Sequence, residues 1–182
     1  MKKLVLVAVL ILGFSVMAMA QDIPATEIFA GYSHFRCDKD AACDLNGWDV
    51  AVAFNINKYV APVVDIHGQY GKQYDPRFFM RDRNFSAHSV MFGPKFMMPV
   101  GRFTPFGQFL VGVYHSNLGG MQTRKTENNP AIAIGGGVDV SVNSRFSVRA
   151  VQAEYYGIRY LGSVHNDLRI SAGAIFKFGK RY

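Results

Sequence analysis

The sequence predicts an all-β chain that folds as an eight-stranded antiparallel up-and-down transmembrane β-barrel. Three observations lead to this prediction. Stretches of about ten residues alternate apolar residues with polar or small ones, and only a strand sorts residues onto two faces in this way. The charges on the polar faces are nearly balanced in sign, and the connections between the stretches alternate between long and short. Tight turns at one end and longer loops at the other are typical of such a barrel.

Residues 1–20 have the features of a secretory signal peptide. Two lysines precede an apolar run from Leu4 to Phe14, and residues 18–20 (Ala-Met-Ala) form a small-residue cleavage site. An uncleaved membrane anchor is the alternative, although the run is short for a membrane span. We therefore expect one exported domain, residues 21–182. Without the two lysines, 18 of the 20 basic residues remain against 13 acidic ones, so the net charge falls from +7 to +5. These charges are scattered, which together with export argues against nucleic-acid binding.

The first half of the exported domain contains four predicted strands, at 26–36, 47–56, 60–71 and 85–98. The connection between the second and third is tight, whereas those before and after are longer and polar. The first connection contains Cys37 and Cys43, the only cysteines of the chain. An oxidising compartment favours a disulfide between them that closes a small loop. A metal site is the alternative, but no second ligand pair follows at zinc spacing.

The second half contains four more predicted strands, at 103–115, 130–142, 145–158 and 169–179. Tight turns precede the first and third, and polar loops at 116–129 and 159–166 precede the others. The alternation changes parity between Ala150 and Val151, and a β-bulge there keeps both faces consistent. Gly135 to Gly137 lie inside a strand without the Lys and helix of a phosphate-binding loop, so they indicate close packing against long side chains.

The charged faces are expected to line the barrel lumen, with the apolar faces turned to lipid. The predicted lumen charges are five acids and four bases: Glu27, Asp49, Asp65, Lys95, Asp139, Arg149, Glu154, Arg169 and Lys177. A buried charge without a partner is costly, so a closed interior requires such a near balance. We expect Asp139, Arg149, Glu154, Arg169 and Lys177 to form a charge network, as a permanent plug or as the gate of a narrow channel. The competing fold is a β-sandwich or lipocalin-like barrel with its apolar face inward.

The terminal residues Ser171-x-Gly173-x-x-Phe176-x-Phe178 resemble the β-signal that the barrel assembly machinery recognises in outer-membrane proteins. With FAGYSH (29–34), FGPKF (92–96), TPFGQFLVGV (104–113) and GGGVDV (135–140), they resemble the small outer-membrane β-barrel family of OmpA/OmpX type over nearly all of residues 21–182. Here four residues follow the β-signal, whereas family members usually end on its aromatic residue.

This resemblance implies a monomer of the bacterial outer membrane, inserted by the assembly machinery and in contact with lipid and lipopolysaccharide. It implies a structural, protective or surface-interaction role without a reaction or a cofactor. The chain is too short for a periplasmic peptidoglycan-binding domain.

No catalytic or metal site is predicted from the residues. His115-Ser116-Asn117 is similar to the His-x-Ser-Asn sequence of outer-membrane lipid A deacylases. In that pattern the base and the nucleophile share a strand face, whereas adjacent residues point to opposite faces. A lipid A-modifying enzyme is therefore the less favoured alternative. The five histidines lie in different strands or loops without ligand spacing, so we expect no metal.

Two loops offer candidate ligand contacts. Arg77, Arg81 and Arg83 alternate with aromatic residues in one loop, and Arg124 and Lys125 lie in another. Basic groups above the outer leaflet suit lipopolysaccharide phosphates or an acidic extracellular ligand. A solvated loop without a specific partner is the alternative.

Overall fold

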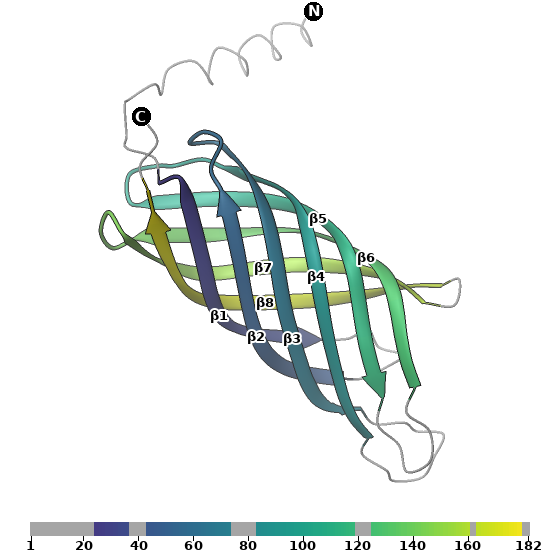
Figure 1. Ribbon diagram of the computed structural model, residues 1–182. Coiled ribbons are helices and arrows are strands. Elements are labelled where there is room, and N and C mark those ends of the chain that lie inside the picture. Colours follow the sequence, from purple (N-terminus) through teal and green to yellow (C-terminus); the bar gives the residue numbers. More distant parts are fainter. Residues whose placement is uncertain (1–23, 37–42, 74–82, 119–124, 161–162, 180–182) are drawn as a thin grey trace, which may run out of the picture.

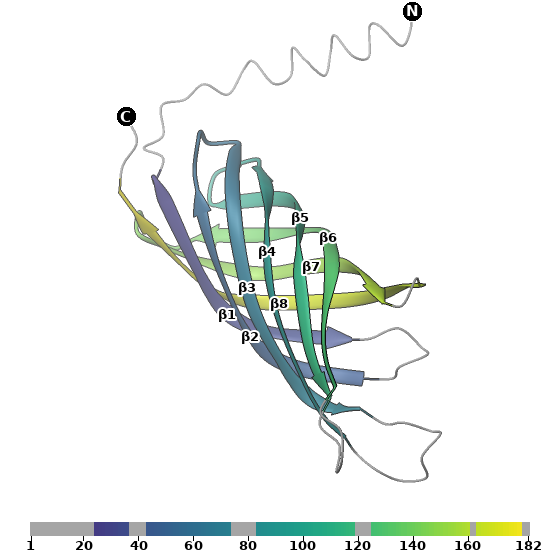
Figure 2. The same ribbon diagram turned by 45° about the vertical axis from the view of Figure 1, so that its right-hand side comes forward.

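The described part of the chain folds into a closed antiparallel barrel (Figures 1 and 2). The computed structural model describes residues 24–36, 43–73, 83–118, 125–160 and 163–179. Its eight strands are β1 (Thr26–Arg36), β2 (Cys43–Phe54), β3 (Val60–Gln73), β4 (Arg83–Met97), β5 (Phe103–Leu118), β6 (Lys125–Ser141), β7 (Phe146–Tyr160) and β8 (Ser163–Phe178). Each strand pairs with the next, and β8 closes the barrel on β1. The predicted fold class is confirmed. No helix among the described residues has the length and apolarity to cross a membrane.

Several strands are longer than the sequence pattern predicts. β2, β6 and β8 begin at Cys43, Lys125 and Ser163, not at 47, 130 and 169. The hairpin of β7 and β8 continues to the pair Tyr160 and Ser163, so the predicted loop at 159–166 is wrong. These extensions lie at the end opposite the tight turns. Backbone pairing continues there although the apolar alternation has ended.

The predicted tight turns are confirmed at the other end of the barrel. The side-chain oxygen of Asn57 accepts hydrogen bonds from the backbone N–H groups of Tyr59 and Val60. Asn143 caps the turn before β7 in the same way. Gly101 adopts a φ of 60°, which suits the turn between β4 and β5 because glycine enters this region without strain. The start of β1 and the end of β8 lie at the same end of the barrel as these turns (Figure 1). We call this end the turn end and the other one the loop end.

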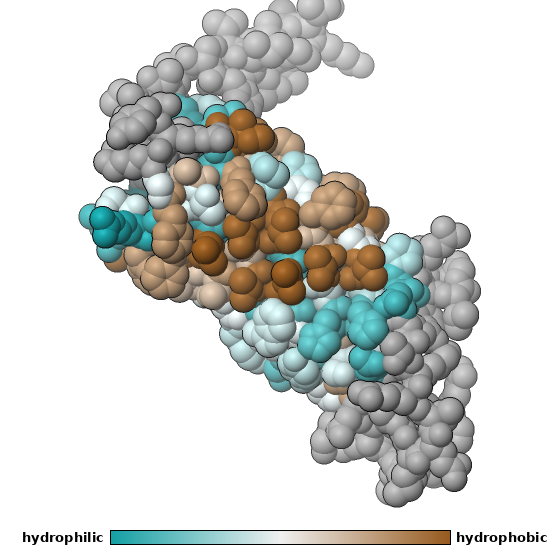
Figure 3. Space-filling model, viewed as in Figure 1, coloured by the Kyte–Doolittle hydropathy of each residue, from teal (hydrophilic) through white to brown (hydrophobic). Residues whose placement is uncertain are grey.

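The outer surface carries an apolar band. Val64, Val90, Ile132, Ile134 and Ile170 point outward and are 38–60% exposed. On the face drawn in Figure 3, apolar residues cover the middle of the barrel and hydrophilic residues lie toward both ends. Soluble monomers rarely expose so many neighbouring apolar side chains, whereas the lipid-facing surface of a transmembrane barrel does.

The predicted β-bulge is present in β7. Val138 faces Val151 and Asp139 faces Arg149, so Ala150 is the extra residue. The pairing of β7 with β8 shifts over the same interval, between Arg149 and Gln152. As a result Arg149 and Gln152, three positions apart, both point into the lumen, where they are 4% and 0% exposed.

Candidate functional site

Charged side chains fill the lumen, and the structure places all nine predicted lumen residues on the inner face. Seven of them are at most 5% exposed: Asp49, Asp65, Lys95, Asp139, Arg149, Glu154 and Arg169. The Glu27 side chain is 13% exposed, and Lys177 is partly buried and donates to Ser141. Most of these charges form two groups.

The group near the turn end, here the Asp139 cluster, consists of Asp139, Arg149, Lys95 and Glu27. Arg149 donates from Nε to Asp139 Oδ1 at 2.8 Å and from Nη2 to Oδ2 at 3.2 Å. Lys95 Nζ lies 3.0 Å from Asp139 Oδ2 and 3.7 Å from Glu27 Oε2. Two cations face two carboxylates, so the Asp139 cluster is neutral.

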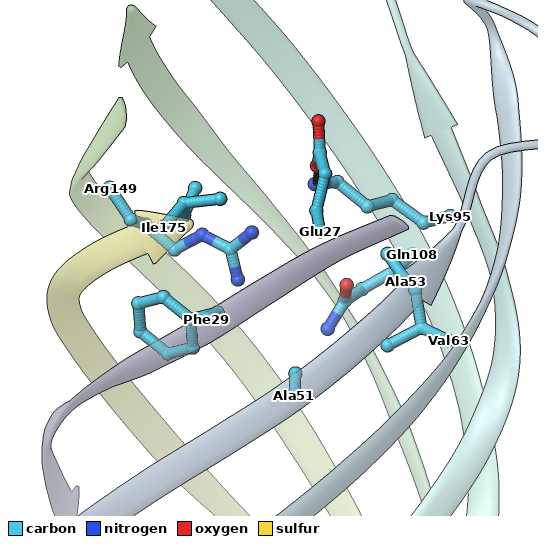
Figure 4. Close-up of a pocket in the computed structure, with 9 residues that line it drawn as sticks. All are labelled: Glu27, Phe29, Ala51, Ala53, Val63, Lys95, Gln108, Arg149 and Ile175. Atoms are coloured by element: carbon cyan, nitrogen blue, oxygen red, sulfur yellow. Dashed lines mark ion pairs between the residues drawn. The ribbon is translucent and has the colours of Figure 1, made fainter. Parts of the chain in front are cut away.

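Aromatic rings hold the two cations of this cluster in place. The Arg149 guanidinium lies 4.3 Å from the centre of the Phe29 ring and 4.4 Å from that of Phe106, and Lys95 Nζ lies 4.4 Å from the Phe106 ring. Figure 4 shows Arg149 above Phe29 and Lys95 extending toward Glu27. Cation–π contacts in a desolvated site add to the attraction between the charges.

The second group, here the Arg169 cluster, consists of Arg169, Asp49, Asp65, His67 and Glu154. Arg169 Nε donates to Glu154 Oε2 at 2.7 Å, and Nη2 donates to the same oxygen and, at 2.9 Å, to Asp65 Oδ2. Nη1 donates to Asp65 Oδ1 at 3.2 Å and lies 3.3 Å from Asp49 Oδ2. The guanidinium is fully buried and joins strands β2, β3, β7 and β8 across the lumen.

Aromatic and amide side chains close the space around the Arg169 cluster. Tyr156 packs against the Arg169 guanidinium at 5.3 Å, and Phe35 contacts the Tyr156 ring edge to face. Gln108 donates to Glu154 Oε1 at 2.6 Å. Gly135 leaves room for Glu154, because a Cβ there would lie 2.6 Å from its Cγ. The close packing predicted for the glycine run is therefore present.

The lumen leaves little free volume. The cavity lined by Phe29, Lys95, Gln108 and Arg149 measures about 10 Å³, and a second beside Asp139 and Lys177 about 20 Å³. A cavity of about 10–15 Å³ accommodates a single water molecule. Between the described lumen residues, these two cavities are thus too small for more than a water molecule or two.

The predicted network is brought together only in part. Arg169 contacts Glu154 and Arg149 contacts Asp139, but these two pairs belong to separate clusters, and the Lys177 side chain donates to Ser141. Gln108, Gln152 and His67 are central to the lumen but were not predicted. The strand parity of His67, two positions after Asp65, is the signal that assigns it to the inner face.

The other predicted sites are placed as follows. Ser171 and Gly173 of the β-signal face the lumen, while Phe176 and Phe178 face outward at 49% and 53% exposure. Arg83 and Lys125 begin β4 and β6 at the loop end. Cys37, Arg77, Arg81 and Arg124 lie outside the described residues, as does the signal peptide, so the disulfide to Cys43, the cleavage and the loop contacts stay predictions.

His115 and Ser116 are not arranged as a base and a nucleophile. Tyr114 is 5% exposed and faces the lumen, so on this strand Ser116 points inward and His115 outward. The Nδ1 atom of His115 hydrogen-bonds Asn128 Oδ1 on β6 at 2.5 Å. The geometry does not form the proton relay that a deacylase of this type needs.

No family model and no curated protein sequence matches the chain. Among solved structures, Neisserial surface protein A (NspA) superposes with a TM-score of 0.71 at 12% identity, covering 85% of this chain and 97% of that one. The attachment invasion locus protein Ail of Yersinia pestis superposes with a TM-score of 0.57 at 16% identity, covering 85% and 99%. These likenesses confirm the predicted resemblance to small eight-stranded outer-membrane barrels at the level of the fold.

Proposed function

We propose that this chain, which has the fold of the small outer-membrane β-barrels, is a non-catalytic protein of the bacterial outer membrane with a structural or surface-interaction role. In this proposal residues 1–20 direct export, and the barrel assembly machinery inserts the domain as a monomer in contact with lipid and lipopolysaccharide. The outward apolar band supports membrane insertion. Fractionation of cells, with boiled and unboiled samples compared by electrophoresis, tests this. A heat-dependent shift of the membrane fraction is expected, and an unshifted protein in the periplasmic fraction contradicts the proposal.

The filled lumen is the observation that carries the non-transport role. Arg169 bridges four strands at 0% exposure, and two cavities between the described lumen residues measure only about 10 and 20 Å³. Recordings in planar lipid bilayers test whether the network is a permanent plug or a gate. We expect no conductance steps from the wild type or from Arg149→Ala. Steps in the wild type that change in this variant favour the narrow-channel alternative.

A surface-interaction role is supported by the position of the basic residues. Gln73 pairs with Arg83 and Leu118 with Lys125, which places both basic residues at the loop end of the barrel. The crystal structure of Ail in complex with the heparin analogue sucrose octasulfate has a TM-score of 0.57 to this chain. By analogy, we infer that Arg77, Arg81, Arg83, Arg124 and Lys125 bind a polyanion, either the phosphates of lipopolysaccharide or an acidic extracellular ligand.

Glutamine at all five positions tests this role. Retention on a heparin column and binding to lipopolysaccharide should both fall relative to the wild type. Arg102→Gln with Arg145→Gln is the matched control, because these two arginines are exposed at the turn end. Equal loss in the control, or unchanged binding in the loop variant, contradicts a specific contact. The mass of lipid A from cells with and without the protein tests the enzyme alternative, and we expect no mass change.

A further inference from the structure

The outer wall of the barrel carries aromatic and imidazole side chains next to one another. Trp48 on β2 and Tyr70 on β3 face outward at 40% and 46% exposure. His88 on β4 and His115 on β5 are partly exposed, and each directly follows a buried residue, so they share this outer face. We call these four residues the outer-wall patch.

The outer-wall patch lies at the edge of the apolar band that is nearer the loop end. On β5 the outward residues from Phe103 to Val113 are apolar or glycine, and His115 is the next one. About ten residues, at about 3.3 Å each and on a strand tilted by about 40°, rise by about 25 Å, which is the height of the apolar band in outer-membrane barrels. On β4, His88 is likewise the next outward residue beyond Val90. Since the longer loops of such barrels face outside, this position corresponds to the headgroups of the outer leaflet.

Three rings of the outer-wall patch form a continuous surface. The Trp48 indole lies across β3 on Gly68, because a Cβ at that position would lie 2.7 Å from its Nε1 atom. Trp48 Nε1 also donates to Tyr70 Oη at 3.5 Å. The His88 ring contacts the Tyr70 ring edge to face at 5.6 Å and lies 6.4 Å from the Trp48 ring. The glycine therefore gives the indole a fixed seat beside the other two rings.

The two imidazoles of the patch lack an anionic partner. His88 and His115 are directly opposite each other on neighbouring strands, an arrangement that separates Cβ atoms by about 4.5–5.5 Å. The Nδ1 atom of His115 hydrogen-bonds Asn128, which leaves Nε2 for a ligand. In the described structure the His88 ring contacts aromatic rings and makes no hydrogen bond. None of the described outward-facing residues of β3 to β6 is acidic.

We propose that His88 and His115 together bind a phosphate group of a lipid A-type glycolipid, with the attached sugar lying against Trp48 and Tyr70. Imidazole N–H groups donate to phosphate oxygens, and these hydrogen bonds strengthen when the imidazole is charged. The apolar face of a sugar ring suits an exposed aromatic surface, whereas a phospholipid offers the phosphate without the ring. The inference rests on the proposed function, since the barrel meets this lipid only in an outer membrane.

The fluorescence of Trp48 tests the proposal, because it is the only tryptophan of the chain. The full chain is refolded into micelles of a polyoxyethylene detergent, whose headgroup contains neither phosphate nor sugar. Titration with lipid A that carries both phosphates should change the emission saturably. The double variant His88→Gln, His115→Gln should bind this lipid about tenfold more weakly or worse, because it loses hydrogen bonds to a charged group. Lipid A without phosphates and phosphatidylglycerol should each bind the wild type about tenfold more weakly as well.

His34→Gln is the matched control. His34 also lies on the outer wall, but its Nδ1 atom hydrogen-bonds Asn46 at 2.9 Å and its Nε2 atom lies 3.8 Å from an Asp44 oxygen. This variant should bind lipid A as the wild type does. Equal weakening in the control, or wild-type affinity in the double variant, overturns the role of the histidine pair. Equal affinity for phosphatidylglycerol overturns the choice of a glycolipid.

A second measurement on the wild type does not depend on how the variants fold. In vesicles that contain phospholipids brominated at different depths, bromines near the headgroup should quench Trp48 most strongly. Strongest quenching from the middle of the bilayer overturns the position of the patch. A barrel in the membrane fraction whose Trp48 emission does not respond to lipid A overturns the lipid site and leaves the proposed function standing. A protein in the periplasmic fraction overturns both.

Discussion

Replacement of Arg169 by methionine is the most informative perturbation of the barrel. Methionine has a similar length and no charge, so it removes the guanidinium without a large change in volume. Arg169 donates to Asp65 and Glu154, which are both 1% exposed. The variant leaves these carboxylates buried without their cation.

The expected loss of unfolding free energy follows from the contacts that the Arg169→Met variant removes. Removal of one partner from a buried, hydrogen-bonded ion pair destabilises a protein by about 3–5 kcal/mol. Arg169 serves three carboxylates, but they can take up protons once it is gone, so we expect a loss within this range and not a multiple of it. At an m-value of about 2 kcal/mol/M, the urea midpoint should fall by about 1.5–2.5 M.

The assay is equilibrium unfolding in urea, in detergent micelles, with the folded fraction measured by electrophoresis of unboiled samples. Lys177→Met is the control, because the described structure gives the Lys177 side chain one hydrogen bond, to Ser141, and leaves it partly exposed. Its free energy of unfolding should fall by about 1 kcal/mol or less. Equal midpoints for the two variants would refute the view that the Arg169 cluster stabilises the barrel.

Three further predictions concern packing, lipid and assembly. Gly135→Ala should destabilise the folded barrel by about 1–3 kcal/mol in the same assay, because the new Cβ would lie 2.2 Å from a backbone oxygen. Gly107→Ala is the control and should not destabilise it, because the nearest atom to its new Cβ lies 3.7 Å away. Ile134→Arg, in the middle of the apolar band, should lower the free energy of unfolding in lipid vesicles by about 2–4 kcal/mol, because an arginine is costly at the middle of a bilayer. Val142→Arg, beside a turn, should lower it by only about 0–1 kcal/mol. Equal effects would contradict the proposed position in the membrane. Phe178→Asp should reduce the amount of inserted barrel in cells but leave refolding in detergent unchanged. Unchanged insertion in cells would contradict the proposal that the terminal β-signal directs assembly.

Strand faces could be predicted from the sequence because alternation is a local property. Arg169 and Lys177 point inward since they share parity on β8, and successive side chains of any strand point to opposite faces. The same rule located the bulge beside Ala150, because a change of parity within a strand needs an extra residue. The strand ends at Lys125 and Ser163 were missed because the backbones there continue to pair although the sequence no longer alternates apolar with polar residues.

The partners of the buried charges were decided only by the tertiary structure. Arg169 meets Asp65, 104 positions away, because β8 closes on β1 and the stagger of the strands sets which inward side chains lie at the same height. The sequence by itself predicted five acids and four bases in the lumen, close to balance, but missed Asp167, which is buried on the same face of β8 as Arg169. When the sheet closes into the barrel, these charges are distributed unequally. The Arg169 guanidinium is the one cation beside three carboxylates, whereas Asp139 lies between two cations. Local covalent geometry determines which face a charge takes, whereas the distance between two charges depends on how the whole sheet closes.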